Sequence, residues 1–218
     1  MQVINIYTKK QASLLVGNTT TTSKMPCKSY SLPTENCITG SKMAKIKGSI
    51  CNNCYAMKGN YHRFKSNILP TQKKRLHSIK HPKWVDSMIA LIGKDSLFRW
   101  HDSGDIQSIN HLAKICEIAT KMPNTKFWIP TREYKIISDY AKLNIIPSNL
   151  IVRLSAMFID KAVKIPKSLQ GLKNITVSNV HTIKPIGVEC ESYKQGGKCL
   201  SCTKCWNVNI PIISYKNH

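Results

Sequence analysis

The sequence predicts an α/β protein whose parallel strands and helices form a barrel or partial barrel. Between residues 97 and 178, short apolar segments alternate with amphipathic stretches, which is the pattern of βαβ units. The chain lacks the G-x-G-x-x-G and P-loop motifs of common nucleotide-binding sheets. Polar residues follow directly after the apolar segments, where barrel proteins build their sites. We therefore expect a partial (β/α) barrel with a small cysteine-rich segment at its C-terminal end.

Three segments are expected along the chain. Residues 1–30 form an N-terminal extension, and 31–180 form the α/β partial-barrel domain with an N-terminal cysteine loop. Residues 181–218 form the cysteine-rich C-terminal segment, which we expect to bind a cluster. In the extension, Val3–Tyr7 is a short strand candidate, and the threonine-rich stretch 18–23 is typical of a loop.

The helices of the domain are predicted by apolar residues that recur at three- and four-residue intervals. Such a pattern runs from Phe64 to Ile92 and is interrupted at His81-Pro82, so two helices should meet near that proline. Two further helices are expected at 109–122 and 134–143. The first carries an apolar face of Leu112, Ile115, Cys116 and Ile118. We expect Cys116 to be an ordinary core residue.

Four strands are expected at 97–101, 126–129, 150–154 and 175–178. If these strands are parallel, the residues after each one meet at a single edge of the sheet. This expectation puts the following side chains on one face: His101, Asp102, Asp105, Thr131, Arg132, Arg153 and Ser155. His101 and Asp102 are candidate acid–base or ligand-orienting groups, although a structural hydrogen-bonded pair is equally consistent with the pattern.

The C-terminal cysteines have the spacing of a metal centre. Cys199, Cys202 and Cys205 form C-x-x-C-x-x-C, and Cys190 precedes them across a Gly-Gly turn. Four thiolates without a histidine suit a [4Fe–4S] cluster or a Cys₄ zinc site, and the triple spacing favours iron–sulfur ligation. We also expect Trp206, beside the last cysteine, to shield the cluster from water.

A second group of cysteines lies near the N-terminus. Cys37, Cys51 and Cys54 could supply three thiolates, which would leave one iron of a second [4Fe–4S] cluster open to an external ligand. Two alternatives stay open at this point. Cys27 could complete a closed Cys₄ site, or these cysteines could be free while the chain carries a single cluster at its C-terminal end.

Composition narrows the class of protein. The 33 Lys and Arg residues against 11 Asp and Glu give a formal net charge of +22. Such a field attracts polyanions, so DNA or RNA is an expected partner, unless the lysines reflect only a lysine-rich composition. No signal peptide or membrane-spanning segment is evident, which predicts a cytoplasmic protein. Nine cysteines in that compartment indicate metal binding rather than disulfides.

The chain resembles two families. The distant likeness is to radical S-adenosylmethionine enzymes, through Cys37, Cys51 and Cys54 and through the strand end Ser103-Gly104-Asp105. It implies a radical-SAM-like partial barrel, with S-adenosylmethionine as a ligand. Ser103, Gly104 and Asp105 would then contact its amine and Arg153 its carboxylate. The usual C-x-x-x-C-x-x-C spacing and Gly-Gly-Glu motif are both altered here.

The closer resemblance is to the bacteriophage "gene product eighty-eight" domain family. It is carried by four pieces: Ser31-Leu32-Pro33 with Cys37, Cys51-x-x-Cys54-Tyr55-Ala56-x-Lys58-Gly59, Arg99-x-His101-Asp102-Ser103-Gly104-Asp105, and Cys199 to Trp206 with Tyr215 and His218. The resemblance implies a phage iron–sulfur protein in the host cytoplasm. The resemblance does not indicate a substrate.

Three functions are consistent with these features. The first is a radical-SAM-like or redox enzyme with one or two [4Fe–4S] clusters that acts on nucleic acid or nucleotides. The second is a non-catalytic, basic nucleic-acid-binding protein whose cluster is structural or redox-sensing. In the third, zinc holds a small scaffold together.

Overall fold

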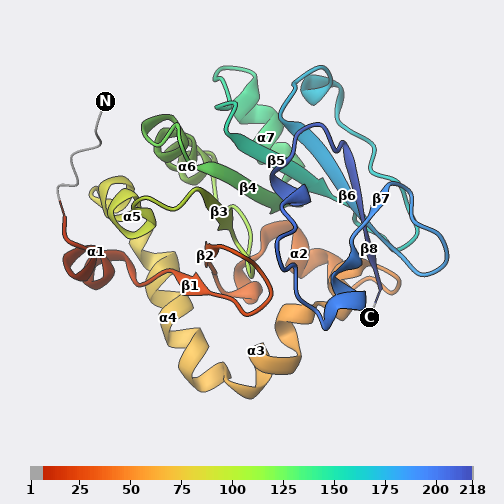
Figure 1. The fold of residues 1–218 in the computed structure, drawn as a ribbon, viewed down its shortest axis with the longest axis horizontal. Coiled ribbons are helices and arrows are strands. Elements are labelled where there is room, and N and C mark those ends of the chain that lie inside the picture. Colours follow the sequence, from red (N-terminus) through yellow and green to blue (C-terminus); the bar gives the residue numbers. More distant parts are fainter. Residues whose placement is uncertain (1–6, 218) are drawn as a thin grey trace.

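The computed structural model describes residues 7–217, apart from the side chain of Asn60. They form an α/β fold around one eight-stranded sheet with the order β1-β2-β3-β4-β5-β6-β8-β7 (Figure 1). Strands β2 to β8 are parallel to their neighbours, and the short β1 pairs with β2 in the antiparallel direction. The sheet does not close. Its strands are β1 Thr20–Thr21, β2 Lys28–Tyr30, β3 Leu97–Trp100, β4 Lys126–Thr131, β5 Leu150–Ser155, β6 Ile175–His181, β7 Val188–Glu189 and β8 Ile212–Lys216.

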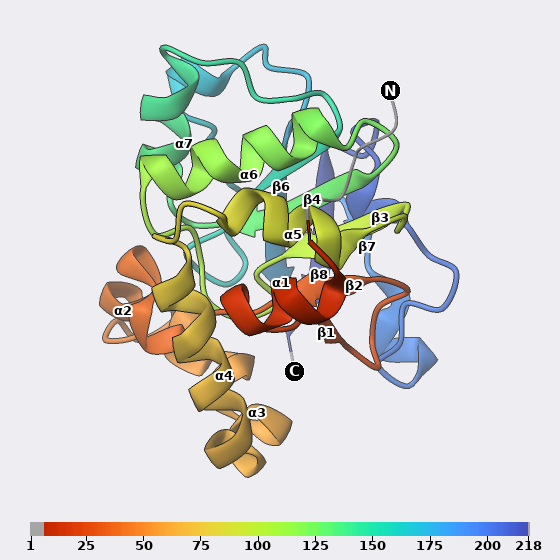
Figure 2. The same ribbon diagram turned by 90° about the vertical axis from the view of Figure 1, so that its left-hand side faces the viewer.

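The described residues form seven α-helices, several of which cover one face of this sheet. They are α1 Lys9–Val16, α2 Ile38–Met43, α3 Gly59–Arg63, α4 Lys65–Ser78, α5 Trp84–Ile92, α6 Ile109–Lys121 and α7 Tyr134–Ala141. Figure 2 shows α1, α5 and α6 side by side in one layer, while α3 and the start of α4 project away from it. The described residues contain no helix long and apolar enough to cross a membrane.

The main core lies between the sheet and the helix layer. Strand residues of one parity point into it, among them Phe98, Trp100, Phe127 and Ile129, all fully buried. Each such side chain contributes roughly 1.5–3 kcal/mol by leaving water. Cys116 on α6 belongs to this core, as predicted.

The strand residues between those core residues point to the other face of the sheet. There the chain places Arg99, Trp128 and Arg153, which the C-terminal segment covers. Trp206 packs edge-to-face on Trp128 at 5.2 Å between ring centroids, and its Nε1 donates to the Phe98 carbonyl at 2.9 Å. The C-terminal segment is therefore built against the sheet and helps to bury it.

The predicted α/β class with parallel strands is confirmed. The sheet is open, and the predicted partial barrel of radical-SAM-like type is not confirmed. The predicted strands appear as β3 to β6, each within a few residues of the expected bounds, and α4 and α5 meet beside Pro82. Helices α1, α2 and α3 and strands β1, β2, β7 and β8 were not predicted. β1 lies within the threonine-rich stretch 18–23, so the prediction of a loop there was wrong: the stretch pairs with β2. β2 is three residues long, too short for a recognisable alternation. The capping box of α1, in which Thr8 and Gln11 bond each other's backbone, was a usable signal. Of the strand predicted at Val3–Tyr7, all but Tyr7 lies outside the described residues, as does His218.

Candidate functional site

The N-terminal cysteines lie in the connection from β2 to β3, beyond the carboxyl edge of the sheet. Cys37 immediately precedes α2, and Cys51 lies in a short 3₁₀ turn that ends before Cys54. A methyl group placed on Gly40 would lie 3.6 Å from Cys37 Sγ and 3.7 Å from Cys51 Sγ. The sulfurs of these two residues are therefore adjacent, although a long gap separates them in the sequence.

The cysteine loop is anchored to the sheet by Glu133, which follows β4. Its carboxylate accepts from the Thr39 amide at 2.8 Å and from the Thr39 hydroxyl at 2.7 Å. Glu133 is 4% exposed, so this pair holds the start of α2 through buried, charge-assisted hydrogen bonds. A second anchor joins the Ile50 amide to the Met157 carbonyl, beyond β5. The loop is thus held over the ends of β4 and β5.

The surroundings of these thiols are anionic. Burial raises the pKa of Cys37, and Asp105, Cys54, Cys51 and Glu133 raise it further. Burial also raises the pKa of Cys51, and Arg132 opposes this rise. Cys54 raises the pKa of both Cys37 and Cys51, so the three thiols lie close to one another. A cation is the species that such a group of thiols and carboxylates favours.

The C-terminal cysteines lie in the crossover that joins β7 to β8. The Cys190 amide donates to the Ser214 carbonyl on β8 at 2.8 Å, and the Cys202 amide donates to the Cys199 carbonyl at 2.9 Å. Cys205 Sγ lies 3.5 Å from the Tyr215 hydroxyl. Burial raises the pKa of Cys205 to about 11, with a smaller contribution from Cys190. All four predicted ligands thus occupy one segment.

Cys27 belongs with the C-terminal group. It packs with Met25, Trp128 and Trp206, and Cys199 contacts the same cluster. Burial raises its pKa to about 12, with Cys199 adding to the rise. Cys27 is therefore not placed to complete an N-terminal Cys₄ site, which was one of the two alternatives left open by the sequence.

The thiols suit iron–sulfur or zinc chemistry by type, but no preformed metal centre is evident. Within residues 7–217, no three His, Cys, Asp or Glu side chains converge closely enough to hold a metal ion. All nine cysteines are free thiols. The donor set still fits a thiolate-bound cluster by type, because two sulfurs pack against Gly40 and a third thiol is near.

The residues after β3 form a tight junction with those after β2. Gly104 has a φ of 80°, and a Cβ there would lie 2.5 Å from Leu32 Cβ. Ser103 accepts from the Leu32 amide through its carbonyl at 2.8 Å and donates its hydroxyl to the Leu32 carbonyl at 2.8 Å. Ser103 and Gly104, predicted to bind a cofactor, here join the two strand ends.

Asp105 links β3 to β4. Its Oδ1 accepts from the Thr131 hydroxyl at 2.6 Å and from the Ile106 amide at 2.8 Å, and its Oδ2 accepts from the Arg132 amide at 2.9 Å. Burial raises its pKa to about 6, and these hydrogen bonds oppose the rise. Asp105, Thr131 and Arg132 are thus brought together at the carboxyl edge, as predicted, with the Asp105 oxygens largely engaged.

The structure separates the side chains of His101 and Asp102. His101, at a φ of 55°, turns into the core, where its Nδ1 lies 3.1 Å from the Tyr30 carbonyl and its ring lies 5.2 Å from that of His111. Asp102 points the other way and accepts from the Tyr61 hydroxyl. The predicted acid–base pair is therefore divided between two environments.

Arg153 does not face the carboxyl edge with the other predicted residues. It is fully buried, and its guanidinium donates to the carbonyls of Val177 and Ile210 at 3.0 and 3.1 Å and to that of Cys205 at 3.4 Å. It holds the C-terminal crossover against β6. Ser155, at the end of β5, is buried, and its hydroxyl lies 3.4 Å from that of Ser178.

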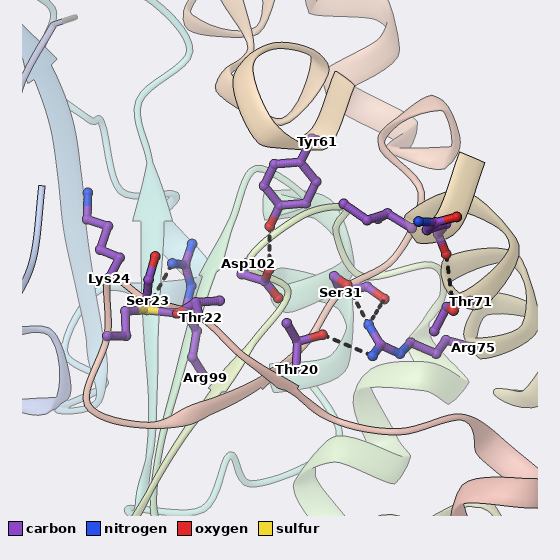
Figure 3. A pocket seen from close by; sticks show the side chains of 13 residues that line it. Thr20, Thr22, Ser23, Lys24, Ser31, Tyr61, Thr71, Arg75, Arg99 and Asp102 are labelled. Carbon is purple, nitrogen blue, oxygen red and sulfur yellow. Dashed lines mark hydrogen bonds between the residues drawn. The ribbon is translucent and has the colours of Figure 1, made fainter. Parts of the chain in front are cut away.

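A pocket of about 430 Å³ opens beside Asp102 (Figure 3). Its walls come from the loop after β1, from α3 and α4, and from β3. Its principal polar residues are Arg75, Arg99, Lys24, Asp102 and Tyr61. Sequence reasoning assigned no role to Arg75 or Tyr61. The usable signal was helical spacing, since Asn67, Thr71 and Arg75 recur every four residues on one face of α4.

Comparison with known proteins gives one match. A family model described as "Gene product 88" matches residues 5–208. No curated protein and no solved structure matches the chain. The matched range includes both groups of cysteines and the pocket.

Proposed function

This chain belongs to the gene product 88 family, and from that premise and its two groups of thiols we propose that it is an iron–sulfur protein. Cys37, Cys51 and Cys54 hold one [4Fe–4S] cluster in this proposal. A second cluster is held by the C-terminal cysteines: Cys190, Cys199, Cys202 and Cys205. The N-terminal centre is the reactive one, and the C-terminal centre is structural or redox-active.

The observation that carries the proposal is the gathering of the N-terminal thiols beyond the carboxyl edge of a parallel sheet. That edge is where α/β proteins build their sites. The sulfurs of Cys37 and Cys51 both pack against Gly40, and Cys54 raises the pKa of Cys37. The donor set contains three thiols and no histidine, which suits a cluster with one open iron.

A [4Fe–4S] cluster with three protein ligands supplies an electron when reduced and leaves one iron open to an external ligand, which we propose to be S-adenosylmethionine. The chain's residues orient and shield this centre. Glu133 fixes the cysteine loop through Thr39, and Asp105 fixes Arg132, whose charge opposes the rise in the Cys51 pKa. The proposed substrate is a nucleotide or nucleic acid, because the chain has a net charge of +22.

The test is anaerobic purification followed by quantitation of iron and sulfide and by absorption near ~400 nm, where iron–sulfur proteins are brown. Two clusters predict about eight irons per chain. Electron paramagnetic resonance of the reduced protein should shift when S-adenosylmethionine is added. The shift should disappear in Cys54→Ala and persist in Cys116→Ala, which removes a core thiol.

Iron for one cluster together with an unshifted spectrum would instead support a second candidate, a non-catalytic nucleic-acid-binding protein. The observation that favours it is the burial of Trp206 and Trp128 beside the C-terminal cysteines, which suits a closed structural site. A colourless protein that contains zinc would exclude iron–sulfur chemistry and leave a zinc-stabilised scaffold.

A further inference from the structure

The pocket beside Asp102 contains two guanidinium groups that form no ion pair with a described carboxylate. Arg75 is 4% exposed and donates to the Ser31 hydroxyl at 2.5 Å and to the Thr20 hydroxyl at 2.9 Å. Arg99 donates to Met25 Sδ and lies 4.6 Å from the centroid of the Trp128 ring. Neither arginine forms a salt bridge with any residue that the structure describes. Arg75 also lies over the Tyr30 ring, and Arg99 donates to the Tyr55 hydroxyl at 3.4 Å. The Asp102 carboxylate attracts both arginines from beyond ion-pair distance. Two guanidinium charges against one carboxylate leave the pocket positive, which favours an anionic ligand.

Unpaired polar atoms gather around the same pocket. Within the described part of the chain, four buried atoms of its lining residues have no hydrogen-bond partner: Thr22 Oγ1, Arg75 Nε, Arg99 Nε and Asp102 Oδ1. Asp102 is 3% exposed, and its other oxygen is engaged by Tyr61. Buried polar atoms that lack partners are rare in folded proteins and mark places where a ligand or water completes the structure.

The chemistry of the walls defines the class of ligand. Arg75 and Arg99 enter from opposite sides of the pocket, with Asp102 between them (Figure 3). Lys24 adds a third cation at the rim. Tyr61 and Ile68 supply an apolar surface on which a flat ring can pack. The volume of about 430 Å³ lies in the range of small-molecule sites, roughly 300–1,000 Å³.

We propose that this pocket binds a nucleotide unit, with its phosphate between Arg75 and Arg99 and an amino or hydroxyl group donating to Asp102 Oδ1. The inference extends the proposed function, since it assigns the nucleotide substrate a place. The phosphate could belong to a free nucleotide or to a single-stranded nucleic acid. Bases of either source have a face that aromatic side chains such as Tyr61 can stack against.

The experiment is calorimetric titration of the full-length protein with adenosine 5′-monophosphate, with adenosine and with a short single-stranded oligonucleotide. Adenosine monophosphate should bind more tightly than adenosine, because only the former offers a phosphate to the arginines. Arg99→Gln should weaken this binding about tenfold or more. Lys167→Gln, which removes one exposed charge outside the pocket, should leave it unchanged.

Arg99→Gln also disturbs the contact with Trp128, so a second variant keeps the test decisive. Thr71→Tyr fills the pocket from the exposed face of α4 without changing any charge, and it should abolish binding while the unfolding midpoint is unchanged. Oligonucleotide binding that depends on both variants, without binding of the mononucleotide, would identify a strand as the source. Equal binding of adenosine and its monophosphate, or binding insensitive to Thr71→Tyr and Arg99→Gln, would overturn the proposal.

Failure here is distinguishable from failure of the iron–sulfur proposal. Iron and sulfide are measured on the same preparations, and Thr71→Tyr should keep the wild-type iron content. Iron without nucleotide binding removes only the pocket inference, and nucleotide binding without iron removes only the cluster.

Discussion

Gly104 lies where the segment after β3 touches the segment after β2. A side chain at this position meets Leu32 Cβ at 2.5 Å and the Leu32 carbonyl oxygen at 2.8 Å, and the backbone φ is 80°. Neither the main chain nor Leu32, fully buried, has room to move. The glycine is therefore required both by conformation and by space.

We predict that Gly104→Ala lowers the free energy of unfolding by roughly 2–5 kcal/mol, because overpacking adds to the strain of a left-handed residue. Gly171→Ala is the matched control. It has a φ of 83° but nothing within 4 Å of the added Cβ, so it should cost only about 1 kcal/mol. Both are measured by denaturant unfolding. Equal losses in the two variants would show that the contact with Leu32 does not matter.

The stability of the folded chain should depend on pH through His101. Burial lowers its pKa to about 4 from an ordinary value of 6.5. The unfolded chain therefore takes up a proton before the folded one as the pH falls. Stability is fully present above pH 6.5 and is lost as the pH falls through 4, by about 3 kcal/mol from this residue. Burial also lowers the pKa of the neighbouring His111, which acts in the same direction.

The measurement compares wild type with His101→Gln by denaturant unfolding across that pH range. The variant should lose less stability on acidification than wild type. His62→Gln, which changes an exposed histidine on α3, should leave the dependence unaltered. A wild-type curve parallel to that of His101→Gln would contradict the assigned cause.

Single residues were predicted with mixed success, for a physical reason. The polar cluster after β3 could be predicted because the titratable residues His101, Asp102 and Asp105 follow an apolar strand. Which way each side chain points was not recognisable. His101 adopts a positive φ and turns into the core. Arg153 donates hydrogen bonds to the carbonyls of Ile210 and Cys205, far along the chain. Both outcomes depend on tertiary contacts that periodicity does not encode.

At the scale of elements, the crossover from β7 to β8 ties the last cysteines to the sheet. The Cys190 amide is bonded to β8, and Trp206 packs on β4 through Trp128. If the four cysteines bind a cluster, this crossover and β8 should gain stability from it, because metal binding is coupled to the folding of the segment that supplies the ligands.

We therefore predict that Cys202→Ala loses about four irons and speeds amide hydrogen exchange across 188–216. Cys54→Ala should lose a similar amount of iron while exchange in 188–216 stays as in wild type. Mass spectrometry of exchanged peptides separates the two variants. Unchanged iron and absorption in Cys202→Ala would disprove the C-terminal assignment.

Long elements were predicted well and short ones poorly. α4 to α7 each bury one face, so the sequence shows a helical period. β3 to β6 stand out as short apolar segments followed by polar residues, and β5 and β6 are buried on both faces. β2 and β8 complete the sheet through pairing with distant strands, and neither has a local pattern strong enough to stand out. The cysteine spacings indicated the two thiol groups, but the position of Cys27 beside Cys199 required the fold.

At the scale of the whole molecule, the net charge of +22 predicts binding to nucleic acid whatever its sequence. Affinity for a single-stranded oligonucleotide should fall by at least about tenfold between roughly 50 and 200 mM salt, since each phosphate contact releases a counterion. Fluorescence anisotropy at several salt concentrations measures this slope, and oligonucleotides of different sequence should bind alike. Undetectable binding at about 50 mM salt would show that the charge reflects composition alone.

The position of β8 sets the order in which the molecule can be assembled. β8 lies between β6 and β7, both of which precede it in the chain. Until residues 212–216 pair with it, the edge of β6 opposite β5 presents a row of unpaired amides and carbonyls. Such an edge recruits strands from other chains. A chain in which 212–216 are removed or displaced is thus expected to aggregate more readily than one in which β8 is paired.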